Sequence, residues 1–155
     1  MKLSTRSRYA TLALFDIAFH NEGQPTQVRQ IAERQDIPAR FLEQIFQDLK
    51  RADLVDGKRG RNGGYYLKRE PERISLGDIV RATEGPIEAS FCQLEDGAQV
   101  HGACPRNSRC IPAVIWGELS TRIAEIYDAY SLADLVQRAL EAGIPRGEPG
   151  YMYFI

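Results

Sequence analysis

The side chains best suited to chemistry in this chain are three cysteines in one short stretch. Cys92, Cys104 and Cys110 are the only cysteines among its 155 residues. Eleven residues separate the first pair and five separate the second, and the glycines and proline between them favour a flexible connection. Thiols on such a segment can converge on one centre, and convergent thiolates bind soft metals or iron–sulfur clusters. The stretch therefore predicts a metal or cluster site.

Other interpretations of the cysteines stay open. An odd number of thiols argues against a disulfide framework and leaves metal binding or thiol redox chemistry. His101 lies three residues before Cys104 and is a candidate fourth ligand, although a solvated loop histidine is the simpler interpretation. Structural zinc held by the three cysteines and His101 is one alternative, and thiols that only pack in a small core are another.

The composition limits the kinds of protein that this chain can be. The apolar content of 43% is ordinary for a globular chain. We read no signal peptide, and no apolar run approaches the roughly 20 residues that span a bilayer, so we expect a cytoplasmic protein with no membrane partner. The only histidines, His20 and His101, come with no nucleophile motif or acid–base constellation. We therefore expect that the chain is not an enzyme.

Charge divides the chain into two unlike halves. Residues 1–73 carry 14 Lys and Arg against 10 Asp and Glu, a net charge of +4. Residues 74–155 carry 6 basic and 11 acidic residues, a net charge of −5. A basic N-terminal half can meet phosphates while the acidic half faces away from them.

The basic half contains a helix-turn-helix pattern followed by a wing. Residues 4–20 predict a first helix, Thr26 offers a capping hydroxyl to a short helix over 27–34, and helical apolar spacing continues from Pro38 to about residue 50. Strand-like residues 54–55 and 65–67 then flank a glycine-rich connection, which predicts a two-stranded wing. Basic side chains on its tip suit phosphates and grooves. They are Lys58, Arg59 and Arg61.

Helices on either side of the cysteines complete the predicted fold, which is mainly α. Ser75 has capping-box spacing ahead of a helix that runs to about Gly85, and Ser131 has the same spacing ahead of a last helix that ends at Gly143. Between them, residues 112–130 predict a long helix with an apolar stripe that needs a partner, most simply a second copy of the chain. We divide the chain into a winged helix-turn-helix domain (1–85), a cysteine-bearing segment (86–111), dimerisation helices (112–143) and a tail without an assignable role (144–155).

This ordered set of motifs resembles the Rrf2 family of bacterial winged-helix transcription regulators, and within it the iron–sulfur sensors of the IscR, NsrR and RirA type. The matching segments are MKLSTRSRYA, QIAERQDIPARFLEQIFQDLKRADLV, RGRNGGYYL, ISLGDIVRATEG, the cysteine segment and the tryptophan helix after it. The resemblance implies a dimer that binds a palindromic operator and carries one two-iron or four-iron cluster per subunit on its three cysteines. Signals of this class are iron or iron–sulfur status, nitric oxide and redox state.

Two departures concern the cluster ligands. IscR-like members have a histidine three residues after the last cysteine, and Ala113 stands there in this chain. Relatives also commonly place five residues between each pair of cysteines, so the first spacing here is longer. A zinc-binding or thiol-redox regulator, or an interaction module that controls a partner enzyme, stays an alternative.

The resemblance also assigns candidate DNA contacts. A recognition helix enters the major groove with its N-terminal side chains, which here are Arg40, Glu43 and Gln44. Arg40 suits guanine or phosphate, Gln44 suits adenine, and Glu43 suits a cytosine amino group. On the wing, Arg59 and Arg61 would reach the minor groove or the backbone, and Lys58 would contact phosphate.

Overall fold

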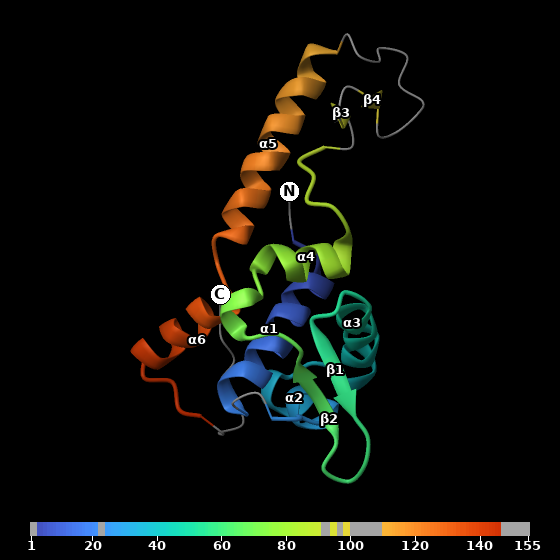
Figure 1. Ribbon diagram of the computed structural model, residues 1–155. Helices are drawn as coiled ribbons and strands as arrows, with labels where there is room; N and C mark the ends of the chain where they lie inside the picture. The colour runs from blue at the N-terminus through green and yellow to red at the C-terminus, as the bar shows by residue number, and fades with distance from the viewer. Residues whose placement is uncertain (1–2, 22–23, 91–93, 96–97, 100–109, 147–155) are drawn as a thin grey trace.

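The chain folds into a helical winged domain from which one long helix projects (Figure 1). The computed structural model describes residues 3–21, 24–90, 94–95, 98–99 and 110–146. Over these residues the elements are α1 (Thr5–His20), α2 (Val28–Gln35), α3 (Ala39–Arg51), β1 (Val55–Lys58), β2 (Gly64–Leu67), the 3-10 turn η1 (Pro71–Arg73), α4 (Leu76–Glu84), β3 (Leu94–Glu95), β4 (Ala98–Gln99), α5 (Ile111–Asp128) and α6 (Leu132–Glu141). The predicted fold class, mainly helical with a two-stranded wing, is confirmed.

Serine side chains begin three of the helices. Ser4, Ser75 and Ser131 precede α1, α4 and α6, and each hydroxyl accepts a hydrogen bond from the backbone N–H three residues later. At α4 and α6 that third residue is an aspartate, whose carboxylate accepts in return from the serine backbone N–H. These reciprocal bonds satisfy donors that a helix start leaves unpaired, so both predicted capping boxes are confirmed.

The start of α2 differs from the prediction. Gln27 rather than Thr26 caps the helix, and its backbone N–H donates to Gln30 Oε1 at 3.2 Å. Thr26 is fully buried, and its hydroxyl donates to the Gln24 carbonyl oxygen and accepts from Asn21 Nδ2. The predicted capping role of Thr26 is wrong because its backbone pairs with strand β2 instead.

The core of the winged domain is built around α1. Its side chains Ala10, Leu14 and Ile17 are fully removed from solvent. Helices α2, α3, α4 and α6 all contribute to the same apolar cluster, so the winged domain and α6 share a single core. The largest fully buried side chains are Phe19, Phe46, Leu14, Ile17, Ile31, Leu42, Ile45, Leu49, Leu54, Ile74, Ile79 and Leu132.

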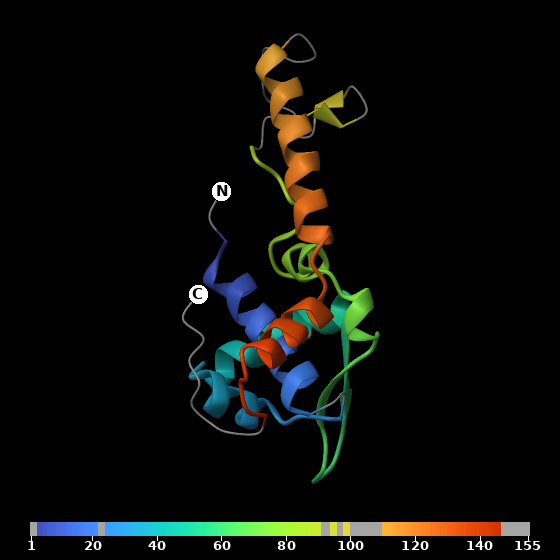
Figure 2. The same cartoon turned by 90° about the vertical axis from the view of Figure 1, so that its left-hand side faces the viewer.

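Helix α5 leaves this core and α6 returns to it (Figures 1 and 2). Of the residues of α5, all of them described, only Ala113 and Ser120 are buried. After α5 the chain pairs with the start of α4, where Leu76 N donates to Tyr130 O and Leu132 N donates to Ile74 O. Helix α6, which the prediction grouped with α5, therefore packs against the winged domain.

None of the described helices combines the length and the apolar character needed to cross a bilayer.

Candidate nucleic-acid interface and cysteine segment

Helix α3 is held against α2 by a tight left-handed turn. Asp36 adopts the left-handed conformation with φ of 50°, and Ile37 N then donates to Ala32 O at 3.1 Å. Aspartate tolerates this conformation better than most residues. Ile37 itself is buried, so the turn fixes where α3 begins.

A buried ion pair ties α2 to the central helix. Asp16 on α1 is fully buried and accepts hydrogen bonds from Arg34 Nη2 at 2.5 Å and from Gln35 Nε2 at 2.9 Å. A buried carboxylate is stable only when it is paired and hydrogen-bonded in this way. The two-helix unit is thereby anchored to the core.

The outer face of α3 carries the predicted DNA contacts. Arg40, Glu43 and Gln44 are all exposed, whereas Leu42 and Ile45 on the inner face are fully buried. Within the described residues no ion pair engages Arg40 or Glu43. The three side chains are free to meet base edges, and their contact with DNA stays a prediction.

The wing is locked to α2 and α3 at its base. Thr26 and Tyr65 exchange two backbone hydrogen bonds of 2.8 Å, which extends the β1–β2 hairpin by a third short segment. The Tyr65 ring stacks on Phe46 of α3 with centroids 4.3 Å apart and an interplanar angle of 8°. Strand β2 is therefore packed directly against α3.

Glycine is required at two positions of the wing, one of which lies against the segment before α2. Gly64 has φ of 151°, and a Cβ on it would lie 2.3 Å from the carbonyl carbon of Thr26. A Cβ on Gly63 would lie 2.2 Å from the Lys58 carbonyl oxygen. Only glycine permits such close backbone approach. Gln27 Nε2 also donates to the Arg61 carbonyl oxygen at 3.1 Å, which fixes the tip to the start of α2.

Charged side chains at the base of the wing are paired, whereas the cations at its tip have no ion-pair partner among the described residues. Lys50 forms an ion pair with Asp56 at 2.6 Å, and this hydrogen bond raises the pKa of Lys50 and lowers that of Asp56. Lys58, Arg59 and Arg61 are exposed, and none of them has an ion pair among the described residues. An unpaired cationic tip is what phosphate contact needs.

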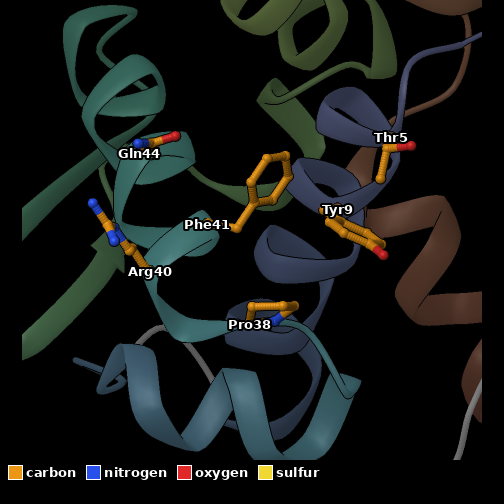
Figure 3. A pocket seen from close by; sticks show the side chains of 6 residues that line it. All are labelled: Thr5, Tyr9, Pro38, Arg40, Phe41 and Gln44. Atoms are coloured by element: carbon orange, nitrogen blue, oxygen red, sulfur yellow. The ribbon is translucent and has the colours of Figure 1, made fainter.

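A shallow hollow of about 480 Å³ opens beside α3 (Figure 3). Pro38 and Phe41 make it largely apolar, and its polar side chains come from two helices. Thr5 and Tyr9 stand on α1, while Arg40 and Gln44 stand on α3. The sequence prediction did not include Thr5 or Tyr9, because nothing local in the sequence shows that the start of α1 lies against α3.

The structure places only a portion of the predicted metal site. Cys110 has a free, half-buried thiol and occupies the position directly before α5. Cys92, Cys104 and His101 lie outside the described residues. Within the described residues no group of three or more His, Cys, Asp or Glu side chains is arranged to hold a metal ion. A short β3–β4 hairpin lies within the segment that the prediction treated as a loop.

The segment that leads to Cys92 is fixed to α5. Ile87 is buried, and Ala89 N donates to Ser120 Oγ at 2.9 Å. Ser120 in turn donates to the Trp116 carbonyl oxygen on the same helix. Both ends of the cysteine segment therefore attach to α5, one through Ala89 and the other through Cys110.

A helix-turn-helix unit, a basic wing locked to its second helix and an unpaired polar face on that helix define a winged-helix DNA-binding protein. The sequence profile of the Rrf2 family, described as iron-dependent transcriptional regulator, matches residues 3–138. The chain belongs to this family and is a transcription regulator, as the resemblance predicted.

Individual relatives agree with this assignment. The chain is 37% identical over 136 residues to the HTH-type transcriptional regulator IscR of Sodalis glossinidius, which covers 88% of this chain and 79% of that protein. The solved structure of T. potens IscR has a TM-score of 0.71 and 34% identity, covering 99% and 97% of the two chains. CymR, the global cysteine regulator of B. subtilis, has a TM-score of 0.68 and 32% identity, covering 89% and 98%.

Proposed function

We propose that this protein is a homodimeric regulator that binds a palindromic operator and is switched by an iron–sulfur cluster held by Cys92, Cys104 and Cys110. The observation that carries the proposal is the attachment of the cysteine segment at both ends to α5, the helix that joins it to the DNA-binding domain. A change in that segment therefore acts on the element that would set the distance between two recognition helices.

The DNA half of the proposal rests on α3 and the wing. Arg40 and Gln44 would read base edges in the major groove, and Glu43 would accept from a cytosine amino group and disfavour other bases. Lys58, Arg59 and Arg61 would contact phosphates or the minor groove. Tyr65 and Phe46 hold these two sets in one fixed relation, so a single docking pose serves both.

The dimer rests on the exposed apolar face of α5. Ile111, Ile115 and Ile126 are 73%, 50% and 62% exposed, and Trp116 and Leu119 are exposed as well. Such a contiguous apolar surface is costly in water and marks an interaction site. A twofold pairing with a second copy would bury it and would match the symmetry of a palindromic operator.

The residues present suit a cluster. Cys110 lies at the N-terminus of α5, where unpaired backbone N–H groups favour a negatively charged ligand such as a thiolate. Cys92 and Cys104 would supply two further thiolates, and His101 is a candidate for the fourth position because Ala113 replaces the histidine of IscR-like members. Bound there, the cluster would supply iron that reacts with oxidants or nitric oxide and that is lost when iron is scarce.

The experiment is anaerobic purification followed by visible spectroscopy, metal and sulfide analysis, and DNA binding of the loaded and the metal-free protein. We expect a brown protein whose affinity for a selected duplex differs between the two forms, and a Cys104→Ser variant in which that difference disappears. A colourless protein with stoichiometric zinc would establish the zinc alternative. A metal-free protein that responds only to thiol oxidation would establish the redox switch. Failure to bind any duplex would leave the interaction module.

A further inference from the structure

The hollow beside α3 is lined by hydrogen-bond donors that the protein itself does not use. The hydroxyls of Thr5 and Tyr9 have no hydrogen-bond partner among the described residues, and the same is true of the Arg40 guanidinium. The Tyr9 ring is held in place by an edge-to-face contact with Phe41, with centroids 5.6 Å apart and an interplanar angle of 89°. Donors on both sides of an apolar floor fit a ligand that has acceptor oxygens and an apolar moiety.

Charge around the hollow favours an anionic ligand. None of its six lining residues carries a carboxylate, and Arg40 carries a positive charge. Arg8 is exposed and follows Thr5 by three residues, so it lies on the same side of α1. A sugar–phosphate backbone combines anionic acceptor oxygens with an apolar deoxyribose and matches this lining.

The position of the hollow relative to α3 indicates which region of DNA would reach it. At 3.6 residues per turn, Phe41 and Phe46 point about 140° apart around the helix. The arc between them faces the core and contains Leu42 and Ile45, whereas the wider arc on the other side of the helix is exposed and carries Arg40 and Gln44. Phe46 contacts the wing and Phe41 contacts Tyr9. The DNA-facing arc is therefore bordered by the wing on one side and by the start of α1 on the other.

A helix about 10–12 Å across fills a major groove that is about 12 Å wide. Both sugar–phosphate backbones that border the groove then lie against whatever flanks the helix. We propose that the hollow is a second backbone-binding site, in which Thr5 Oγ1 and the Tyr9 hydroxyl donate to one phosphate while Pro38 and Phe41 contact the adjoining deoxyribose. This inference rests on the proposed docking of α3 in the major groove.

Neutral donors give this site a distinct role. Lysine and arginine contacts release counterions and make binding salt-dependent, whereas a hydroxyl that donates to phosphate releases none. Thr5 and Tyr9 would therefore fix the register of α3 in the groove without adding to the salt dependence. They are positioning residues for the base contacts of Arg40 and Gln44.

The test compares a Thr5→Val/Tyr9→Phe double variant with wild type on a duplex of about 30 base pairs that the wild-type protein has selected from a random pool. The Tyr9→Phe change keeps the ring that packs on Phe41. We expect roughly tenfold weaker binding with an unchanged slope of affinity against salt concentration. Arg59→Ala serves as the comparator that lowers the slope.

A second arm replaces single phosphates of the duplex by neutral methylphosphonates. One position in each half-site should weaken wild type but not the double variant further, because the hydroxyls and that phosphate act as a pair. Binding equal to wild type, or a loss that couples to no phosphate, would overturn the inference. If the wild-type protein selects no duplex at all, the proposed docking of α3 on DNA is wrong, and the proposed backbone-binding site is then wrong as well.

Discussion

The winged domain buries its large apolar side chains, whereas helix α5 exposes them. In the winged domain the large apolar side chains are buried, and the fully buried carboxylate of Asp16 is paired with Arg34 and Gln35. Along α5 the large apolar side chains face water, and the helix is held to the rest mainly at its end through Asp128 and Arg81. The first region closes its own apolar core, whereas the second exposes an apolar face that the proposed dimer would cover.

In the proposed function, this difference assigns DNA recognition to the winged domain and regulation to α5 with the cysteine segment. Arg40 and the wing take their geometry from the closed apolar core of the winged domain. The cysteine segment is attached to α5, which would form the interface of the proposed dimer. In that proposal, a signal at the cysteines would act first on how the two winged domains are placed.

The largest effect is expected from a core substitution in the winged domain. Phe46 is fully buried and stacks on Tyr65, so Phe46→Ala should lower the free energy of unfolding by about 3–5 kcal/mol. Ile126→Ala on α5 removes a side chain that is 62% exposed and should change it by less than about 0.5 kcal/mol. Urea denaturation at concentrations where the chain is monomeric measures both. Equal losses would show that the two regions do not differ.

A change that should affect α5 alone is the introduction of charge on its apolar face. In an Ile115→Asp/Ile126→Asp variant, two carboxylates would have to be buried in the proposed interface. We expect the dimer dissociation constant to rise by more than about 100-fold, close to 3 kcal/mol, in analytical ultracentrifugation. The monomer should unfold at nearly the wild-type denaturant concentration.

The matched control is Glu118→Gln/Thr121→Val, which changes exposed polar residues on the same helix. It should leave association close to that of wild type. If the aspartate variant stays dimeric, α5 is not the interface, and the exposed isoleucines need another explanation.

Much of the fold could be predicted because its signals are local. Capping serines such as Ser75 and Ser131, the glycine-rich wing and the apolar periodicity of α3 each act within a few residues, and the structure confirms them. The Thr26 cap was wrong because a long-range pairing with Tyr65 outweighed a local preference. The return of α6 to the winged core through Leu132 was missed for the same reason.

The candidate site likewise contains residues that local sequence signals predict and residues that only long-range contacts bring in. Arg40, Gln44 and the wing cations follow from motif and spacing, and the structure leaves them exposed where the prediction needs them. Thr5 and Tyr9 join the site only because α1 crosses α3, and no sequence spacing encodes that crossing. The sequence alone could not predict contacts between elements that are distant in the chain.

One such contact joins the end of α4 to the start of α1 within the winged domain. Glu84, the last residue of α4, accepts hydrogen bonds from the Ser4 backbone N–H at 3.1 Å, from Ser4 Oγ at 2.8 Å and from Ser7 Oγ. Arg6 on the same turn of α1 pairs with Asp48 of α3. The end of α4, from which the chain continues to Cys92, is thus joined through α1 to the recognition helix.

The smallest predicted effect concerns this link and depends on pH. Burial alone would raise the pKa of Glu84, but the hydrogen bonds from Ser7 and Ser4 outweigh it and lower the pKa below its ordinary value of 4.5. A carboxylate with a lowered pKa stabilises the fold when the pH is above that ordinary value, and this contribution is lost as pH falls through the lowered pKa.

Glu84→Gln should therefore lower the free energy of unfolding by about 0.3–1 kcal/mol at pH 7, as for a carboxylate at a helix N-terminus, and by progressively less below pH 4.5. Denaturation at a series of pH values tests this. A Glu84→Gln effect that does not change with pH would mean that the carboxylate acts by shape alone, and α4 and α1 would then be joined without an electrostatic contribution.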